Sequence, residues 1–128
     1  MGPHPALFEE CQVVRMEGEL DLTTAPDLTR ALERARDRST GRLFLIVDLS
    51  RVTFMDGSVL TPLCTAWEDC RRRLGWIRLV HTGPGTSLVL RASGLADRFP
   101  RYASTRDAWW GVPADRAERH PAAADRPA

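Results

Sequence analysis

Five consecutive apolar residues, Leu43-Phe-Leu-Ile-Val47, place the strongest constraint on the fold of this chain. A strand without polar alternation is covered on both faces, as in parallel sheets. The segment before it carries apolar residues at helical spacing over residues 28–35, and Gly41 follows. This pattern predicts a helix over residues 24–38. Because a helix between two strands is typical of a right-handed β-α-β unit, we expect an α/β protein.

The rest of the chain also alternates between strand and helix patterns. Residues 11–20 have Val14 and Met16 on one face and Arg15 and Glu17 on the other, which predicts a half-buried strand near a sheet edge. Further elements are expected as follows: a short strand at residues 7–8; a helix from about residue 58 to Gly75 that buries Leu60, Leu63, Cys64, Trp67 and Leu74; a strand over 76–80; a helix over 87–92; a strand near 101–102; and a helix over 105–110 that packs Trp109 and Trp110 on the sheet.

Polar residues indicate where two of these helices begin. Thr24, followed three positions later by Asp27, resembles a capping box. At the later helix, either Asp56 or Ser58 can accept a backbone N–H as the N-cap. A start at Ser58 keeps Pro62 near the first turn, where its missing N–H costs little. The sequence therefore favours Ser58 as the cap. The three arginines Arg71, Arg72 and Arg73 near the end of this helix are expected to be a solvated cap that favours the helix dipole.

Composition excludes several classes of function. All 18 basic residues are arginine, and lysine is absent, so the chain has neither a Walker A loop nor an amine for Schiff-base chemistry. A formal net charge of +1 gives no electrostatic reason to expect nucleic acid as a partner. No apolar run approaches the roughly 20 residues of a membrane span. The first residues also lack a secretory signal pattern, and we expect a cytoplasmic protein.

Residues with catalytic potential do not form a recognisable constellation. The three cysteines, Cys11, Cys64 and Cys70, fit no zinc spacing and are expected to stay reduced. Ser58 lacks the glycine pattern of a nucleophile elbow. His81 ends an apolar strand, where histidine is more often structural than a ligand. We therefore expect no enzyme activity, no metal and no cofactor.

The pattern of elements indicates one domain. Alternating strands and helices run from residue 7 to residue 111, whereas residues 1–6 and 112–128 carry no apolar periodicity. The Pro, Ala, Asp and Arg repetition of the last segment is typical of disorder. We expect a single α/β domain over residues 7–111 with a disordered segment at each end.

Two short motifs point to a known family. Gly18-Glu-Leu-Asp21 precedes the first helix, and Phe54-Met-Asp56 precedes the later one. At this separation, and with Ser93-Gly-Leu95 further on, the chain resembles the STAS domain of bacterial anti-sigma factor antagonists over about residues 8–110. The resemblance implies a mixed, mostly parallel sheet of four to five strands with helices packed against it. It also implies a monomer or weak dimer that binds an anti-sigma factor with a histidine-kinase-like ATPase fold and so regulates transcription by releasing a sigma factor.

The resemblance also implies where the partner binds. Two segments are expected to form the docking surface: Asp21, Thr23 and Thr24 before the first helix, and Asp56, Gly57, Ser58, Val59 and Leu60 at the start of the later one. In the family, the partner phosphorylates the hydroxyl residue directly after the aspartate. The modified antagonist then dissociates, because the new charges cannot be desolvated beside a carboxylate.

This chain departs from the family at the acceptor position, where it has Gly57. Two interpretations remain: the switch has moved to Ser58, or the protein binds without this switch; the missing acceptor favours the second. Other functions also stay open. A soluble STAS subunit of a lipid or anion transporter is the main alternative, and a nucleotide-sensing or scaffold module is another.

Overall fold

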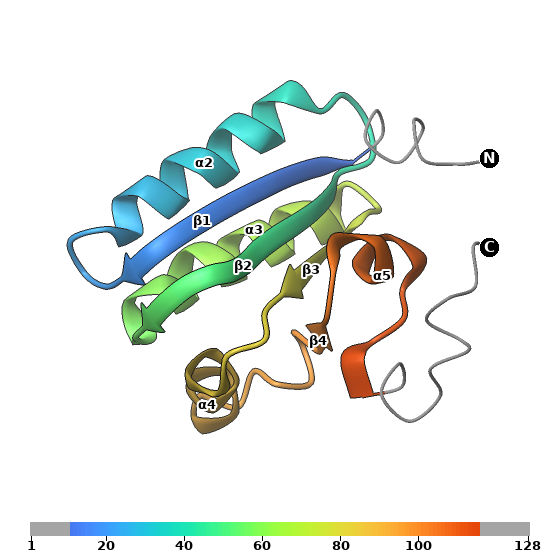
Figure 1. Cartoon of the computed structure of the whole chain (residues 1–128). Coiled ribbons are helices and arrows are strands. Elements are labelled where there is room, and N and C mark those ends of the chain that lie inside the picture. Colours follow the sequence, from blue (N-terminus) through green and yellow to red (C-terminus); the bar gives the residue numbers. More distant parts are fainter. Residues whose placement is uncertain (1–10, 116–128) are drawn as a thin grey trace.

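Four strands form one parallel sheet in the order β1-β2-β3-β4 (Figure 1). The computed structural model describes residues 11–115 of the chain. The strands are β1 (Gln12–Leu20), β2 (Phe44–Met55), β3 (Trp76–Val80) and β4 (Arg101–Tyr102). The helices are α2 (Ala25–Arg38), a 3₁₀ turn η1 (Gly57–Val59), α3 (Leu60–Arg72), α4 (Pro84–Ala92) and α5 (Thr105–Trp110). The predicted α/β class is confirmed, and the three strand pairings among residues 11–115 are all parallel.

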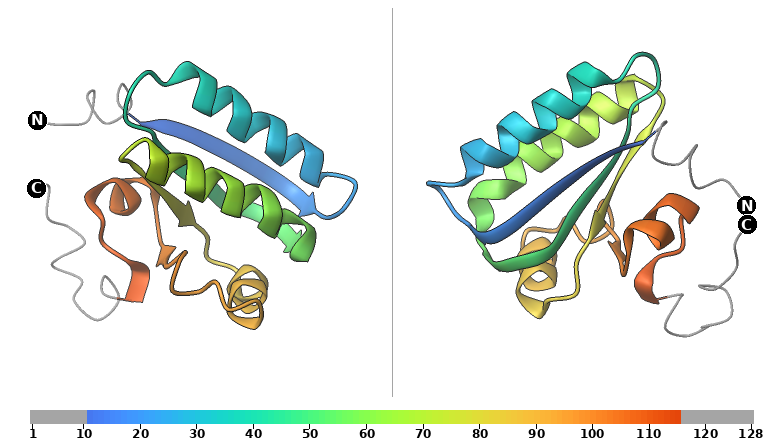
Figure 2. Two further views of the ribbon diagram at one scale, coloured as in Figure 1. Left: turned by 180° about the vertical axis from the view of Figure 1, so that it is seen from behind. Right: turned by 45° about the horizontal axis from the view of Figure 1, so that its top comes forward.

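The helices cover the sheet unequally. Helices α2 and α3 lie side by side on one face, and α5 lies on the other, as both views of Figure 2 show. On β2, Leu45 and Val47 belong to the core beneath α2 and α3, whereas Ile46 belongs to a second core beneath α5. The run Leu43–Val47 is therefore covered on both faces, as predicted. The helical stripe of α2 is also confirmed, because Leu28, Leu32 and Ala35 are buried.

Strand β2 is longer than its apolar run suggested. It continues beyond the apolar run, through Val52 to Met55. Strand β1 follows it with two register shifts, one between Arg15 and Glu17 and one next to Gly18, whose φ is +78°. Such bulges bend a strand and increase its twist. The paired ends of β1 and β2 curve away from the centre of the sheet (Figure 1).

Helix α5 and the aromatic side chains beside it close the second core. Trp109 contacts Trp76 and Phe44, with ring centroids 5.8 and 6.2 Å away. The predicted packing of this helix on the sheet is thus confirmed for Trp109. The guanidinium of Arg78 lies 3.8 Å from the Trp76 ring centroid and donates to the carbonyl oxygen of Ala108 at 2.8 Å. Burial lowers the pKa of Arg78, and these contacts are what fix the end of α5 to β3.

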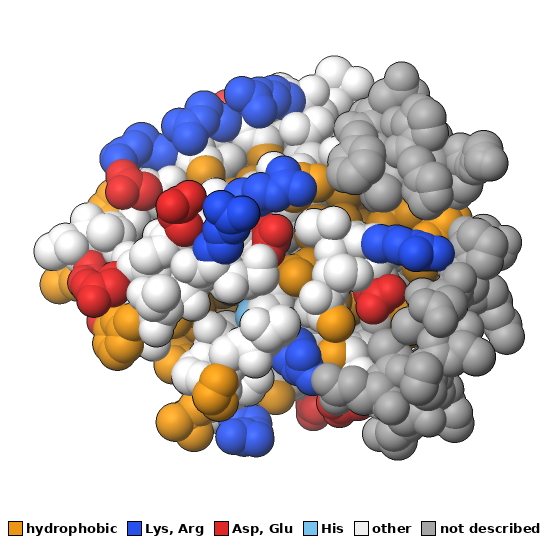
Figure 3. Space-filling model, in the orientation of Figure 1, with side chains coloured by type: hydrophobic (Ala, Val, Ile, Leu, Met, Phe, Trp, Pro, Cys, Tyr) orange, Lys and Arg blue, Asp and Glu red, His pale blue; other side chains and the backbone are white. Residues whose placement is uncertain are grey.

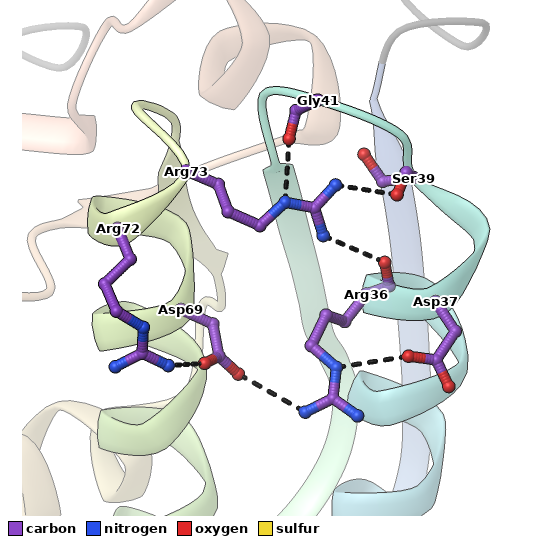
Figure 4. Close-up of polar contacts among 7 residues, drawn as sticks. All are labelled: Arg36, Asp37, Ser39, Gly41, Asp69, Arg72 and Arg73. Carbon is purple, nitrogen blue, oxygen red and sulfur yellow. Dashed lines mark hydrogen bonds and ion pairs between the residues drawn. The ribbon is translucent and has the colours of Figure 1, made fainter.

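Arg73, at the end of α3, joins the two helices of the other face. Its Nε donates to the Gly41 carbonyl oxygen at 2.7 Å, Nη1 to that of Arg36 at 3.0 Å and Nη2 to that of Ser39 at 2.6 Å (Figure 4). The last carbonyl groups of a helix have no partner within that helix, so a cation there satisfies them. The expectation that all three terminal arginines are solvated is wrong for Arg73. We call residues 36–42 and 69–75 the closed end of the helix layer.

Leu74 lies outside the core, contrary to the predicted helical stripe. It is 74% exposed and has a φ of +58°. The Gly75 N–H donates to the Cys70 carbonyl oxygen, and the Leu74 N–H donates to the Arg71 carbonyl oxygen. These two bonds are the Schellman pattern of a helix end. Glycine normally occupies the left-handed position of this motif, but here it stands one residue later. The reason is contact with the residue before β2: a Cβ on Gly75 would lie 1.9 Å from the Leu43 carbonyl oxygen.

All three cysteines are unpaired thiols, as expected, and burial raises the pKa of Cys11 and of Cys70 to about 12.

Ala114 is fully buried, so packing continues past the predicted boundary at residue 111. The predictions for residues 1–6, for the strand at 7–8 and for residues 116–128 lie outside the described residues. Among residues 11–115, none of the helices is both long enough and apolar enough to span a bilayer.

Candidate functional site

Parallel pairing brings the two predicted docking segments together. Leu20, the last residue of β1, pairs with Met55, the last residue of β2. The next residue of the second segment, Asp56, donates its backbone N–H to the Leu20 carbonyl oxygen at 3.1 Å. The carboxyl ends of parallel strands lie at one edge of a sheet, which is where ligands of open α/β sheets bind. We call residues 21–24 and 56–60 the polar corner.

The first segment of the polar corner is organised by one carboxylate. Asp21 Oδ1 accepts the Thr23 hydroxyl at 2.7 Å, the Thr23 N–H at 2.9 Å and the Thr24 N–H at 3.2 Å. The Thr23 hydroxyl and these two N–H groups lower the pKa of the Asp21 carboxyl, because they stabilise its charged form. Asp21 is therefore ionised at neutral pH and presents a fixed negative charge at the corner.

Thr24 does not form the predicted capping box. Its hydroxyl donates to the Glu19 carbonyl oxygen at 2.8 Å and accepts the Asp21 N–H at 2.9 Å, so it makes no side-chain cap of α2. The hydroxyl is thus used to hold the loop back against the end of β1. A sequence pattern cannot distinguish these two uses, since both place a hydroxyl three residues before an acid.

The second segment is capped by Asp56, and the prediction of Ser58 as the cap is wrong. Asp56 Oδ1 accepts the Ser58 N–H at 2.9 Å and the Ser58 hydroxyl at 2.5 Å. The reasoning from Pro62 missed the intervening 3₁₀ turn η1, after which α3 begins only at Leu60. Pro62 is then the third residue of α3, where the missing N–H would have had no helical partner.

The side chains of the second segment differ in how far they are accessible. Gly57 is exposed, and Asp56, Ser58 and Leu60 are half-buried. Val59 is completely buried under the helix layer, so it supports the turn and its side chain offers no surface to a partner. A Cβ built on Gly57 would approach only Leu60 Cδ1, at 3.9 Å, and the backbone there is not left-handed. The conformation of the turn therefore does not require glycine at position 57.

Two exposed apolar side chains in and beside the corner were not among the docking residues expected from the sequence. Leu22 is 77% exposed within the first segment, and Phe54 is 52% exposed just before the second. These exposed side chains offer apolar contact area beside the polar groups of the corner. The sequence signal was present for Leu22, which stands alone between polar residues in a loop. Phe54 belongs to the part of β2 that the apolar run did not reveal.

The described residues carry no sign of a metal centre at the corner. Within residues 11–115, no three His, Cys, Asp or Glu side chains come together in a group that could hold a metal ion. The corner offers carboxylates, hydroxyl groups and a glycine on a firm turn. Such an arrangement can recognise another polypeptide through hydrogen bonds and shape.

Comparisons with known proteins agree with this geometry. The sequence model of the STAS domain family matches residues 7–108. An anti-sigma factor antagonist from Mycobacterium paratuberculosis has a crystal structure that is 32% identical, with a TM-score of 0.70, over 81% of this chain and 86% of that one. The anti-sigma-F factor antagonist RsfA of Mycobacterium tuberculosis is 26% identical over 96 residues, 75% of each chain. The phosphorylated form of the Bacillus cell fate determinant SpoIIAA shares the fold, with 24% identity and a TM-score of 0.58 over 80% of this chain and 91% of that one.

Proposed function

Because the chain belongs to the STAS domain family, we propose that it acts as an anti-sigma factor antagonist, a protein that binds an anti-sigma factor and thereby releases a sigma factor. Two relatives with the highest identities reported above carry this description. The observation that supports the proposal is the Asp56–Leu20 hydrogen bond, which holds the second corner segment against the end of β1, directly before the first segment. Apart from the buried Val59, the residues that the family motif assigns to partner binding then lie near one another.

The proposed partner is an anti-sigma factor with a histidine-kinase-like ATPase fold. Asp21 and Asp56 would meet donor groups of this partner, while Leu22 and Phe54 would supply apolar contact area at the margin. Buried apolar anchors contribute most of the affinity in many interfaces, and polar groups set the orientation. The alternative is a soluble STAS subunit of a lipid or anion transporter. Co-purification from the native host would separate the two, since an ATPase-fold protein and a membrane transporter differ in size and solubility.

The second part of the proposal is that this antagonist lacks the usual phosphorylation switch. SpoIIAA is known in a phosphorylated form, and in the family the acceptor directly follows the aspartate. Here that position is Gly57, although the turn has room for a side chain. The neighbouring Ser58 hydroxyl already donates to Asp56 at 2.5 Å. A phosphate on Ser58 would replace this bond with repulsion between two anions, which would disturb the turn itself.

A charge at position 57 tests the docking surface. Gly57→Asp should abolish binding to the anti-sigma factor, because the added carboxylate must be desolvated beside Asp56 in the complex. Gly57→Ala is the matched control, and it should bind within about threefold of wild type since its Cβ meets only one atom at 3.9 Å. Isothermal titration of the purified partner measures both. Wild-type affinity in Gly57→Asp, with unchanged thermal unfolding, would exclude the corner as the interface.

Mass spectrometry tests the missing switch. Wild type and Gly57→Ser are incubated with ATP and the anti-sigma kinase, and any phosphate is located by fragmentation. We expect phosphate only in the variant, on the serine introduced at position 57. Stoichiometric phosphoserine at position 58 of the wild-type protein would instead show that the switch has moved.

A further inference from the structure

Two exposed arginine side chains share one tryptophan ring. The guanidinium carbon of Arg98 lies 4.3 Å from the centroid of the half-buried Trp67 ring, and that of Arg71 lies 4.8 Å from it. Among residues 11–115, neither guanidinium forms an ion pair, and their one hydrogen bond runs from Arg98 Nη1 to Cys64 Sγ at 3.8 Å. Stacking on the ring stabilises each cation, but the two positive charges also repel each other. An anion between them would remove this repulsion.

The neighbouring residue on α3 shows the usual alternative. Arg72 is also exposed, but it pairs with the carboxylate of Asp69. Figure 3 shows a similar arrangement over β1 and β2, where basic and acidic side chains lie next to one another. Arg71 and Arg98 differ from these groups because two unpaired cations are held at the same ring.

Both arginines line a cavity of about 300 Å³ beside β3. This volume lies at the lower end of the range for small-molecule sites. Strand β4 pairs only with Leu79 and Val80. The earlier part of β3, Trp76 to Arg78, therefore has no described strand on that side, and these residues border the cavity. The cavity thus results from the shortness of β4.

The charges around this cavity favour an anion. Arg78, the third arginine of the lining, stacks on Trp76 and has no carboxylate partner among the described residues. Burial lowers the pKa of Arg78, and a nearby anion would offset this effect. Its Nη1 already donates to the carbonyl oxygens of Ala108 and Trp109, so Arg78 contributes positive charge to the cavity.

The size of the excess charge indicates the class of anion. Asp97 is the one acidic residue of the lining and is exposed. Three arginines and one aspartate leave two positive charges in excess. A phosphate monoester carries about two negative charges at neutral pH, whereas a simple carboxylate carries one. Guanidinium groups also bind phosphate oxygens through two parallel N–H bonds.

We propose that this cavity, which we call the Trp67 cavity, binds the phosphate group of a small phosphate monoester. The guanidinium groups of Arg71 and Arg98 would donate to the phosphate oxygens while they remain stacked on Trp67. The cavity is larger than a phosphate group, so it would also take a short organic part. The site lies beside the closed end of the helix layer and does not depend on the function proposed above.

Titration of the full-length, ¹⁵N-labelled protein with glycerol 3-phosphate tests the site. The chain has four tryptophans, and the variant Trp67→Phe identifies the indole N–H signal of Trp67. At constant ionic strength, glycerol 3-phosphate and inorganic phosphate should each shift this signal saturably. Sodium butyrate, a monoanion, should shift it without saturation. No saturable shift with either phosphate, or saturation by butyrate at the same concentration, would overturn the proposal.

Three variants with the same change of charge show whether the bound anion depends on the arginines at Trp67. Arg71→Gln and Arg98→Gln should each bind glycerol 3-phosphate about tenfold more weakly, because each lacks one charged donor. Arg72→Gln is the matched control: it removes one positive charge from the same end of α3, outside the cavity lining, and should bind within about twofold of wild type. Thermal unfolding checks that all three variants are folded. Equal weakening in Arg72→Gln would show attraction by the general surface charge and would contradict a specific site.

Discussion

At the closed end of the helix layer, Arg73 reaches across 32 to 37 positions of sequence to bind the end of α2. At the polar corner, by contrast, the carboxylates of Asp21 and Asp56 bind groups only two or three positions away. One backbone hydrogen bond, from Asp56 to Leu20, holds the second corner segment to the end of β1, next to the first segment. The two ends of the same pair of helices are therefore held by bonds of different reach.

This difference indicates that the closed end stabilises the fold and that the polar corner presents a surface. Long-range bonds at the closed end fix how α2 and α3 lie relative to each other and to β2. Short-range bonds at the corner shape each turn but contribute little to the rest of the domain. Changes at the corner should consequently alter binding with a small loss of stability, whereas changes at the closed end should mainly destabilise the protein.

The largest effect is expected from Gly75→Ala at the closed end. The new Cβ would lie 1.9 Å from the Leu43 carbonyl oxygen, which accepts the Trp76 N–H at 3.0 Å. Backbone must move to relieve this overlap, so the variant should lose more than about 3 kcal/mol of unfolding free energy. Gly83→Ala is the control, since no atom lies within 4 Å of its Cβ. Urea denaturation compares the two, and a loss in Gly75→Ala as small as in the control would contradict the close packing described here.

A smaller loss is expected when the Arg73 side chain is removed. Arg73→Ala removes the side-chain donor of the Ser39 and Gly41 carbonyl groups and leaves that of Arg36 with the Ser39 N–H alone, so the variant should lose about 2 kcal/mol. Arg73→Lys should recover less than half of this loss, because an ammonium group cannot reproduce the planar arrangement of donors in the guanidinium group. Arg72→Ala removes an exposed neighbour and should change stability by less than about 0.5 kcal/mol. Equal stability of Arg72→Ala and Arg73→Ala in chemical denaturation would contradict the distinction between Arg73, which binds backbone carbonyl groups, and Arg72, which is solvated.

At the polar corner, Asp56→Ala should cost about 1 kcal/mol, the usual value of one N-cap. The Ser58 N–H and hydroxyl lose their acceptor, but both can bind water at this half-exposed turn. Thermal unfolding measures the loss of stability, and titration with the anti-sigma factor measures binding. We expect binding to fall by more than tenfold. A stability loss as large as that of Arg73→Ala would show that the two ends do not differ in the way described.

The smallest expected effect is a gain, and not a loss, in the free energy of unfolding. Leu74 adopts a left-handed conformation that costs a residue with a side chain about 1–2 kcal/mol, and its side chain is 74% exposed. Leu74→Gly removes this strain but makes the unfolded chain more flexible, so a net gain of about 0.5 kcal/mol is expected. Equilibrium unfolding in urea, with Leu88→Ala as an exposed-leucine control, measures the gain. Destabilisation of Leu74→Gly beyond the control would mean that the Leu74 side chain contributes packing.

Patterns within one element were predictable from the sequence. The run Leu43–Val47 and the apolar stripe of α2 depend on local periodicity, and burial follows it closely. The family motifs also located both corner segments. Side-chain hydrogen bonds between distant segments leave no pattern in the sequence. Arg73 could not be distinguished from Arg72 in a run of three arginines, because the carbonyl groups it binds belong to the end of α2 and to the loop after it.

Other differences between the sequence predictions and the structure arose where two local preferences compete for the same position. Gly75 was expected to end α3, but its missing Cβ is used for contact with Leu43, and the left-handed position falls to Leu74. Ser58 and Asp56 are both good caps, and the choice between them depended on a 3₁₀ turn without a sequence signal. His81 was assigned a structural role from its place after a strand. That its ring nitrogens have no hydrogen-bond partner among residues 11–115 became evident only from the side chains packed around it.

The most direct test of the account is chemical-shift mapping of the ¹⁵N-labelled protein during titration with the anti-sigma factor. We predict that the backbone amide signals of residues 21–24 and 56–60 change most, and that those of the closed end, residues 36–42 and 69–75, stay almost constant. Large changes at the closed end with an unperturbed polar corner would contradict the assignment of holding and binding to opposite ends of the helix layer.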